Sequence, residues 1–324
     1  MSSRLILLFI ILVLSCWARQ ASAQAFNWTD SQDVVGKIKR TAVTAKDTLY
    51  DVGMAHGIGF NEMRVANPTI DAWLPADGSE VVVPSEFILP SIREGVVINL
   101  REYRLYFFPE GGAQVITYPV GIGKETSPSP LISTQVKLKI EKPNWYPPKS
   151  VREAYFVEHG EELSWEVPPG PKNPLGPYAI QLDLPDYFIH GTNKSFGIGT
   201  KISRGCIRLD NDDLSKFVWE VPKYTPVTFI EEPVKVGMRG DELVVEFHFD
   251  KHNDDQTRQI AEDQIIDTVV QKVGQIEKSV GPITIDFAAL HEALKAPKGF
   301  PQTIGIKKAD LVEVSLVLPS QLSK

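Results

Sequence analysis

Cysteine is scarce in this chain of 324 residues, which holds two, Cys16 and Cys206. Two cysteines exclude the disulfide framework that staples many small secreted domains. The Cys-x-x-Cys and His-Glu-x-x-His spacings of zinc sites are also missing. His248 and His252 would share a face only on a helix, whereas the alternating apolar residues before them favour a strand. We therefore predict no metal site.

The chain also lacks a basic excess and a long apolar run. Its 34 Lys and Arg against 41 Asp and Glu give a net charge of −7, which argues against a nucleic-acid partner. The run Leu5–Leu14 is about ten residues long, half of what a membrane-spanning helix needs. Because Arg4 precedes this run and Ala21-Ser22-Ala23 follows it, residues 1–23 are predicted to be a secretory signal peptide that is removed.

An alternative processing site lies at Cys16, because Val13-Leu14-Ser15-Cys16 loosely resembles a bacterial lipobox. Leu14 fits that motif poorly, so cleavage after Ala23 is favoured over a lipid anchor at Cys16. That cleavage leaves Cys206 as the one cysteine of the mature chain. In an oxidising compartment a single thiol cannot form an internal disulfide, so its presence points to a role such as catalysis.

Cys206 follows His190 in the sequence, and the connection between them is rich in glycine. A thiol with a pKa of about 8.5 needs an imidazole beside it to act as a nucleophile at neutral pH. Glycine allows the chain to fold back and bring the two side chains together. The amides of Gly205 and Cys206 could then stabilise an oxyanion. The alternative is an inert buried cysteine and an ordinary polar histidine.

Two cations flank the cysteine, Arg204 and Arg208. A core cysteine has no need of them, whereas a nearby positive charge lowers the pKa of a thiol. We therefore expect a lowered pKa for Cys206 and favour a thiol acyl-transfer site.

Three motifs stand in order across this region: His190-Gly191-Thr192-Asn193, Phe196-Gly197-Ile198-Gly199 and Ser203-Arg204-Gly205-Cys206-Ile207-Arg208-Leu209. Together they resemble the signature of the L,D-transpeptidases, whose YkuD-type catalytic domain remodels bacterial peptidoglycan. Upstream runs are similar to the periplasmic branch of Gram-negative bacteria, namely Tyr118–Gly123, Pro143–Pro148 and Val167–Gly176. The resemblance covers residues 95–232. It implies a mostly β fold with a YkuD-type β-sandwich catalytic domain, exported to the periplasm.

The resemblance also implies roles for single residues. Cys206 would be the nucleophile and His190 its general base, with the backbone carbonyl of Gly191 as third member. Three residues would orient the nucleophile or stabilise the oxyanion: Gly205, Gly191 and Ser203. Five residues would bind the substrate: Arg208, Arg204, Asn193, Trp145 and Tyr146.

The chain departs from the family pattern at two places. Arg204 stands where most members have histidine, and an arginine cannot act as a base, although it can bind a carboxylate. The usual Thr-Pro-x-Gly appears as Ser129-Pro130-Leu131-Ile132, and the lost glycine affects a turn near the site.

Residues 40–86 resemble LysM, a small βααβ module that binds the glycan of peptidoglycan. Residues 43–52 are predicted to be a strand that passes into a helix capped by Asp47 or Thr48, and Asn67-Pro68 would end a second helix. The segment Val81-Val82-Val83-Pro84 would close the unit with a strand. The alternative is a plain α+β linker domain.

Residues 95–232 form the β-rich catalytic domain, in which a proline-rich stretch interrupts the strands. That stretch, residues 143–177, is too long for an ordinary connection and is predicted to be the wall of the substrate cleft. Trp145 and Tyr146 would line the cleft or pack beneath it.

Residues 234–324 are predicted to be a small α+β domain of unknown role. We expect a hairpin at 234–238 and 243–249, an amphipathic helix whose apolar stripe runs from Ile260 to Ile276, a helix at 286–294 and a strand at 311–318.

The resemblance implies a peptidoglycan L,D-transpeptidase that needs no metal or organic cofactor. Cys206 would form a thioester with the diaminopimelate of a tetrapeptide stem and release D-Ala. The acceptor would be an amine of another stem, or a lysine of an outer-membrane lipoprotein or β-barrel protein. Two alternatives remain: a cysteine carboxypeptidase or endopeptidase that uses water, and a catalytically inactive wall-binding scaffold.

Overall fold

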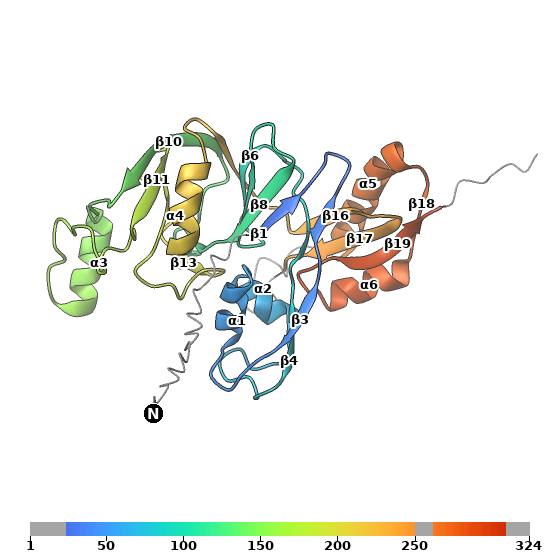
Figure 1. The fold of residues 1–324 in the computed structure, drawn as a ribbon, viewed down its shortest axis with the longest axis horizontal. Coiled ribbons are helices and arrows are strands. Elements are labelled where there is room, and N and C mark those ends of the chain that lie inside the picture. The colour runs from blue at the N-terminus through green and yellow to red at the C-terminus, as the bar shows by residue number, and fades with distance from the viewer. Residues whose placement is uncertain (1–23, 250–261, 309–324) are drawn as a thin grey trace, which may run out of the picture.

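The computed structural model describes residues 24–249 and 262–308. Within these ranges the fold is mostly β, which confirms the prediction, and its centre is a curled nine-stranded sheet (Figure 1). In spatial order the strands are β1 (Gln24–Asn27), β8 (Gln114–Pro119), β7 (Arg104–Phe108), β6 (Gly95–Asn99), β15 (Pro226–Ile230), β10 (Ser133–Glu141), β11 (Tyr178–Leu182), β12 (Phe188–His190) and β14 (Ile207–Arg208). Neighbours are antiparallel, except that β6 pairs with β15 and β12 with β14 in parallel.

The middle of this sheet is buried on both faces because alternate residues of a strand point to opposite sides. Side chains of β6 and β7 accordingly divide between two apolar clusters, with Val96, Ile98, Leu105 and Phe107 in one and Val97, Tyr106 and Phe108 in the other. On the first face lies helix α4 (Asn211–Glu220), which buries Leu214, Phe217 and Val218. The second face is covered by elements that precede the sheet in sequence.

Those elements are here called the N-terminal unit: β2 (Val34–Gly36), β3 (Lys39–Ala42), α1 (Leu49–Ala55), α2 (Phe60–Ala66), β4 (Glu80–Val83) and β5 (Glu86–Ile88). β3 pairs with β4 around the two helices, and β2 pairs with β5. Leu49 and Met63 of the helices share the cluster that contains Val97 and Tyr106 of the sheet. The N-terminal unit and the catalytic sheet therefore have one continuous apolar core.

The helix ends of this unit follow from local side chains. Thr48 begins α1 with a capping box, in which its hydroxyl accepts from the Asp51 amide and the Asp51 carboxylate accepts from the Thr48 amide. Asn67 ends α2. The sequence predicts that residues 43–52 are a strand that passes into a helix capped by Asp47 or Thr48. The helix and its Thr48 cap are as expected, whereas the strand is misplaced, because β3 ends at Ala42.

The described residues after 233 form a four-stranded sheet in the order β16 (Val234–Arg239), β17 (Glu242–Phe247), β19 (Gln302–Lys307) and β18 (Ile283–Ile285). Helices α5 (Glu262–Val280) and α6 (Phe287–Lys295) pack on it, and α5 buries Ile265, Val269 and Val273 at helical spacing. Asp286 caps α6. Sequence analysis missed β18 and β19, while Ile260 and the strand predicted at 311–318 lie outside the described residues.

The proline-rich stretch is here called the α3 segment, residues 143–177, because it contains the helix α3 (Lys149–His159) that the sequence analysis did not predict. Gly160, with φ of 72°, ends this helix in the left-handed conformation that glycine adopts without strain. Figure 1 shows α3 projecting beyond the ends of β10 and β11, away from the N-terminal unit.

Candidate active site

His190 and Cys206 are brought together by two adjacent strands. β12 and β14 are parallel, with Ile189 opposite Ile207 and His190 opposite Arg208. Both isoleucines point into the apolar core, so His190 and Arg208 project from the other face of the sheet. Cys206 directly precedes β14 and, two residues from Arg208, falls on the same face as His190. The glycine-rich connection therefore folds back as expected.

The imidazole of His190 is buried and held in one tautomer. Its Nδ1 lies 2.6 Å from the backbone carbonyl oxygen of Gly191. A carbonyl oxygen only accepts, so Nδ1 must carry the proton, and Nε2 of the neutral ring is left unprotonated. Burial, reinforced by the positive charge of Arg208, lowers the pKa of His190 to about 4. At neutral pH the ring is therefore a neutral base.

The thiol of Cys206 has the opposite shift from the one expected. Burial raises its pKa, and the Asp186 carboxylate adds to the rise. The backbone amide of Phe188 and the cation of Arg208 lower the pKa of Cys206 but do not offset burial. The sulfur lies 3.5 Å from the Asp186 carbonyl oxygen, to which the thiol donates. The expectation of a lowered pKa is therefore wrong, because it counted the cations and not the burial.

The turn that carries Cys206 is held by two serine hydroxyls. Ser203 Oγ accepts from the Gly205 amide at 3.1 Å and donates to the Cys206 carbonyl. Ser129 Oγ donates to the Gly205 carbonyl at 2.8 Å and accepts from the Gly123 amide at 3.0 Å. The Gly205 amide is thus engaged inside the turn, contrary to the expectation that it faces an acyl oxyanion. Ser203 lies where it can orient the nucleophile.

Gly205 is required by its conformation and its surroundings. Its φ is +106°, a region that side chains disfavour. A Cβ would lie 3.1 Å from the Tyr187 ring and 3.4 Å from the Pro128 carbonyl oxygen. Tyr187 therefore packs directly against the turn, a contact that the sequence motifs did not predict.

The expected substrate-binding residues lie in different places. Arg208 is beside the thiol and the imidazole, whereas the Arg204 side chain is exposed. Asn193 is exposed and donates to the Lys172 carbonyl at 3.2 Å, at the base of the α3 segment. Trp145 forms an isolated β-bridge with Val167, and Tyr146 donates to the Glu166 carboxylate at 3.1 Å. The last two therefore bond within the α3 segment.

Asn173, which sequence analysis did not single out, organises that segment. Its buried amide donates to the carbonyl of Pro143 at 2.8 Å and to that of Val167 at 3.1 Å. Its carbonyl oxygen accepts from the Leu175 amide at 2.9 Å. One side chain thus ties the two ends of the α3 segment together, which a sequence motif cannot reveal because its partners are backbone groups.

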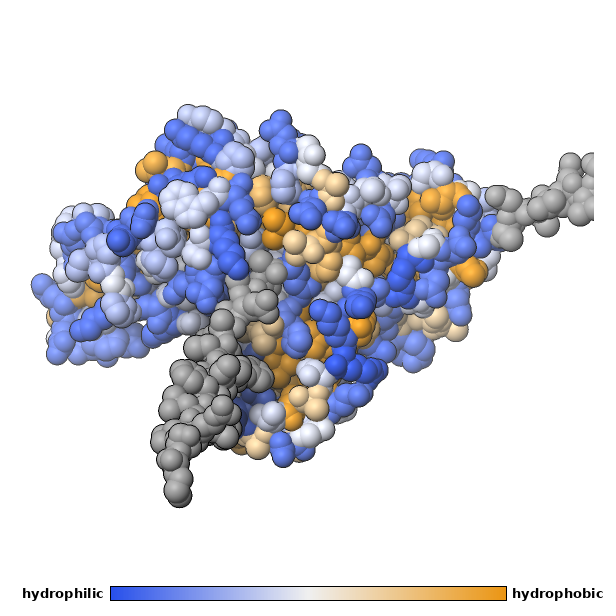
Figure 2. Space-filling view, viewed as in Figure 1, coloured by the Kyte–Doolittle hydropathy of each residue, from blue (hydrophilic) through white to orange (hydrophobic). Residues whose placement is uncertain are grey.

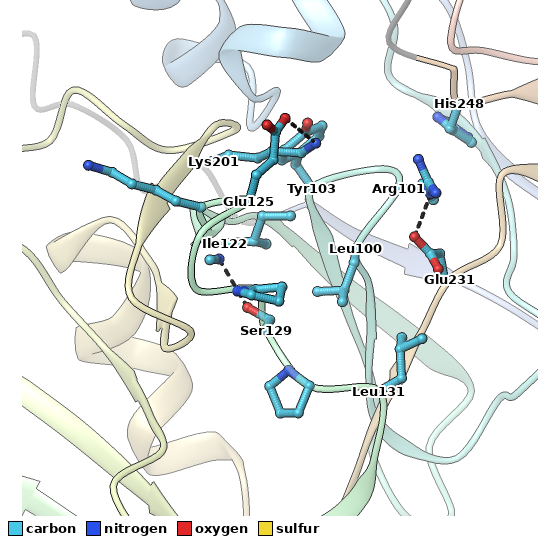
Figure 3. Close-up of a pocket in the computed structure, with 14 residues that line it drawn as sticks. Leu100, Arg101, Tyr103, Ile122, Glu125, Ser129, Leu131, Lys201, Glu231 and His248 are labelled. Atoms are coloured by element: carbon cyan, nitrogen blue, oxygen red, sulfur yellow. Dashed lines mark hydrogen bonds and ion pairs between the residues drawn. The ribbon is translucent and has the colours of Figure 1, made fainter. Parts of the chain in front are cut away.

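A cavity of about 470 Å³ lies beside Ser129, the residue that bonds the Gly205 carbonyl, and Figure 3 shows Ser129 on the cavity wall. Apolar side chains of Leu100, Tyr103, Ile122 and Leu131 line it. Four of its charged residues form two ion pairs, Lys201 with Glu125 at 3.3 Å and Arg101 with Glu231 at 2.6 Å. Cys206 and His190 are not among its lining residues.

Three potential metal ligands meet in the described part of the chain, Glu102, Glu246 and His248. The ammonium of Lys235 lies 2.5 Å from the Glu102 carboxylate and 2.6 Å from that of Glu246. It therefore stands where a cation would bind, and it neutralises the buried carboxylates. His248 Nε2 lies 3.2 Å from the Glu246 carboxylate.

Residues 93–229 match the YkuD family, described as an L,D-transpeptidase catalytic domain. The chain is 42% identical over 212 residues to the Salmonella typhimurium protein named "Probable L,D-transpeptidase ErfK/SrfK", an alignment that covers 64% of this chain and 68% of that protein. It is 36% identical over 280 residues to "Probable L,D-transpeptidase YbiS" of Escherichia coli, covering 84% of this chain and 89% of that protein.

Among solved structures, an L,D-transpeptidase from Mycobacterium smegmatis matches at 16% identity, over 49% of this chain and 74% of that one, with a TM-score of 0.33. The sequence matches agree on one class of enzyme, the transpeptidases. At these identities and coverages the chain belongs to the L,D-transpeptidase family.

Proposed function

We propose that Cys206 is the nucleophile and His190 the general base of a peptidoglycan L,D-transpeptidase. Nε2 of His190 takes the thiol proton as the sulfur attacks the carbonyl at the L-centre of diaminopimelate in a tetrapeptide stem. The carbon–nitrogen bond to D-Ala then breaks, and the leaving amine takes that proton from the imidazole. The product is a thioester on Cys206 and free D-Ala.

The observation that carries this proposal is the bond between His190 Nδ1 and the Gly191 carbonyl, which leaves Nε2 as an acceptor. The two pKa shifts support the same mechanism. A lowered pKa for His190 and a raised pKa for Cys206 give a neutral imidazole and a neutral thiol at rest. The thiol is therefore deprotonated during attack, by general-base catalysis, rather than stored as a thiolate.

In the second step an amine attacks the thioester, His190 takes its proton, and the thiol is restored. The acceptor is an amine of another stem peptide or a lysine side chain of an outer-membrane lipoprotein or β-barrel protein. Thiol and imidazole supply the nucleophile, the base and the acid, so the reaction needs no metal or organic cofactor. Arg208, beside the reacting groups, is suited to bind a stem carboxylate.

We further propose that residues 40–86 bind the glycan of peptidoglycan, that residues 95–232 are the catalytic domain and that residues 234–324 are a separate domain. A glycan site beside the catalytic site raises the local concentration of stem peptides. Residues 1–23 would direct the chain to the periplasm. No helix within the described residues is long and apolar enough to cross a bilayer.

The test is mass spectrometry of peptidoglycan fragments incubated with the purified protein. Wild type should release D-Ala from tetrapeptide stems and form a product joined to an added amine. Cys206→Ser should do neither, although its thermal unfolding should match wild type, because the two side chains are nearly the same size. D-Ala release by Cys206→Ser would refute the nucleophile. A product with water alone would identify the enzyme as a carboxypeptidase or endopeptidase.

A further inference from the structure

Asn211 connects helix α4 to the segment that follows the catalytic histidine. It is the first residue of α4, and its side chain bonds both backbone groups of Thr192. Its Oδ1 accepts from the Thr192 amide at 2.9 Å, and its Nδ2 donates to the Thr192 carbonyl at 2.9 Å. The amide side chain thus pairs with Thr192 as a neighbouring strand would.

Two glycines make room for this side chain. A Cβ at Gly191 would lie 2.3 Å from Asn211 Oδ1, and one at Gly176 would lie 2.6 Å from it. Real Cβ atoms do not approach oxygen so closely, so both positions must be glycine while Asn211 occupies the slot. Gly191 therefore has two functions in the structure: its carbonyl accepts from His190 Nδ1, and its lack of a side chain leaves room for Asn211.

The two hydrogen bonds meet on one peptide group. The carbonyl of Gly191 and the amide of Thr192 belong to the same planar unit, so neither can turn without the other. Asn211 accepts from the amide end of this plane, and His190 Nδ1 donates to its carbonyl end at 2.6 Å. The orientation of the carbonyl that holds the histidine proton is therefore set from the other end by Asn211.

Asn211 is not needed to cap its own helix. Asp210 is the N-cap of α4, and its carboxylate accepts from the Asp212 amide at 2.9 Å. Both polar atoms of the Asn211 side chain are directed to Thr192 instead.

We propose that Asn211 is a positioning residue for the reaction, and this rests on the proposed roles of His190 and Cys206. By fixing the Gly191–Thr192 peptide plane, Asn211 keeps the proton of the neutral imidazole on Nδ1 and leaves Nε2 free to accept the thiol proton. Without it the carbonyl turns away, the ring samples the tautomer with the proton on Nε2, and that fraction of the enzyme has no base.

Asn211→Asp is the sharpest variant because it keeps the shape and the oxygen that accepts from Thr192. It replaces the donor with a second oxygen that faces the Thr192 carbonyl. That carbonyl belongs to the next peptide plane, so the repulsion displaces Thr192, the residue that joins the two planes, and turns the Gly191–Thr192 plane with it. Asn211→Ala removes both bonds and serves as a second variant if the first does not fold. The matched control is Asp212→Asn, an exposed change at the next position of the same helix.

The decisive readout is the tautomer of His190, measured on the full chain by long-range ¹H–¹⁵N correlation of the imidazole, with the signal assigned by its loss in His190→Gln. Wild type and Asp212→Asn should show Nδ1 protonated. Asn211→Asp should show a mixture, and its kcat for D-Ala release should fall about tenfold, as the loss of one hydrogen bond in the transition state would give.

An Asn211→Asp spectrum identical to wild type would overturn the inference, as would a wild-type ring protonated on Nε2. A folded variant that lost activity with its tautomer unchanged would also overturn it, since a purely structural role would then suffice. If the wild-type protein released no D-Ala, the proposed function would fail on its own, and the tautomer comparison would still decide whether Asn211 positions His190.

Discussion

The connection between His190 and Cys206 meets the N-terminal unit on one side and the α3 segment on the other, and the two hold it very differently. On the first side the contacts include backbone groups of the connection itself. Asn61 donates its amide to the Gly199 carbonyl at 3.2 Å, and the Tyr50 hydroxyl donates to the Ser195 carbonyl at 2.5 Å. A glycine of each partner lies at the contact, since a Cβ on Gly59 would be 2.9 Å from Gly199 Cα.

Aromatic packing strengthens this first side. Phe196, in the middle of the connection, contacts the rings of Tyr50 at 5.7 Å, Phe60 at 6.3 Å and Trp73 at 5.3 Å between centroids. Phe60 and Trp73 stack on each other at 4.7 Å. The connection between His190 and Cys206 thus adds the Phe196 ring to a cluster whose other members belong to the N-terminal unit.

The α3 segment shows the contrast. No residue of α3 is buried, and Figure 2 shows a largely hydrophilic surface over it. The aromatic residues Phe156 and Trp165 are more than half exposed. Asn193 of the connection donates a hydrogen bond to the Lys172 carbonyl, and the end of the segment, at Gly176, packs against Gly191 and Thr192. The comparison teaches that the position of the connection between His190 and Cys206 depends mainly on the N-terminal unit. Changes in that unit should therefore reach the candidate active site, while equal changes in helix α3 should not.

The largest effect is expected from Arg104, whose guanidinium lies 2.8 Å from the Glu62 carboxylate and joins α2 to β7 with both side chains buried. Arg104→Ala leaves a buried carboxylate without its partner and should lower the free energy of unfolding by about 3–5 kcal/mol. The control is Arg40→Ala, whose partner Glu80 is exposed; such pairs contribute about 0–1 kcal/mol. Urea unfolding measures the free energy of unfolding of both variants. Equal losses in the two would contradict the interpretation that a buried ion pair joins the N-terminal unit to the sheet.

The second effect concerns pH and compares the buried His190 with His159 of α3. Above the ordinary pKa of 6.5 the ring of His190 is neutral in both the folded and unfolded chain. As the pH falls toward 4, the unfolded chain binds a proton there and the folded chain does not. The free energy of unfolding should therefore drop by about 3 kcal/mol between these values on account of this residue.

The measurement is urea unfolding at pH 7 and pH 4 in wild type, His190→Gln and His159→Gln. His190→Gln should remove part of the acid destabilisation, and the exposed His159→Gln should leave it unchanged. Identical pH dependence in wild type and His190→Gln would show that the imidazole takes up its proton in the folded state.

The third effect compares two phenylalanines of nearly equal exposure, Phe196 at 51% and Phe156 at 53%. Phe196→Ala loses ring contacts with three residues of the N-terminal unit and should cost about 1–2 kcal/mol, with a lower kcat for D-Ala release because the connection loosens. Phe156→Ala, in α3, should change the unfolding free energy by less than about 0.5 kcal/mol. Thermal unfolding and assays of D-Ala release test both variants. Similar losses of stability in the two would mean that the exposed fraction of the ring, and not its contacts, determines the cost.

The sequence was enough to predict that the chain folds back between His190 and Cys206, because both lie in one contiguous, glycine-rich stretch, and the two residues lie on or beside adjacent strands. Their catalytic pairing stays a prediction. It also indicated the mostly β fold, since short apolar runs separated by turn residues mark central strands such as β6 and β7. What it missed depends on distant partners. Ser129 reaches Gly205, Asn173 joins backbone groups of one long segment, and Asn211 pairs with Thr192. None of these residues has an unusual neighbourhood in the sequence.

The errors have a common physical origin, which is burial. A raised pKa for Cys206 could not be foreseen from its flanking cations, because desolvation depends on the whole fold. Lys235 gives the same lesson, since a lysine within a strand is usually read as solvent-facing, yet it is buried between two carboxylates. Sequence patterns report which groups are present, and the fold decides which of them water can reach.

The smallest effect on stability is expected from replacing the two arginines that flank Cys206, Arg204 and Arg208. The two replacements should differ in their effect on the pKa values of Cys206 and His190. Arg208 lowers the pKa of both Cys206 and His190, whereas the exposed Arg204 is not among the groups that shift either pKa. Arg208→Gln should therefore raise both pKa values and move the acid limb of kcat/KM to higher pH. Arg204→Gln should leave both where they are. The measurements are the pH profile of Cys206 alkylation and of D-Ala release, with unfolding as a check on folding. A shift in Arg204→Gln equal to that in Arg208→Gln would mean that Arg204 also faces the thiol when substrate is bound.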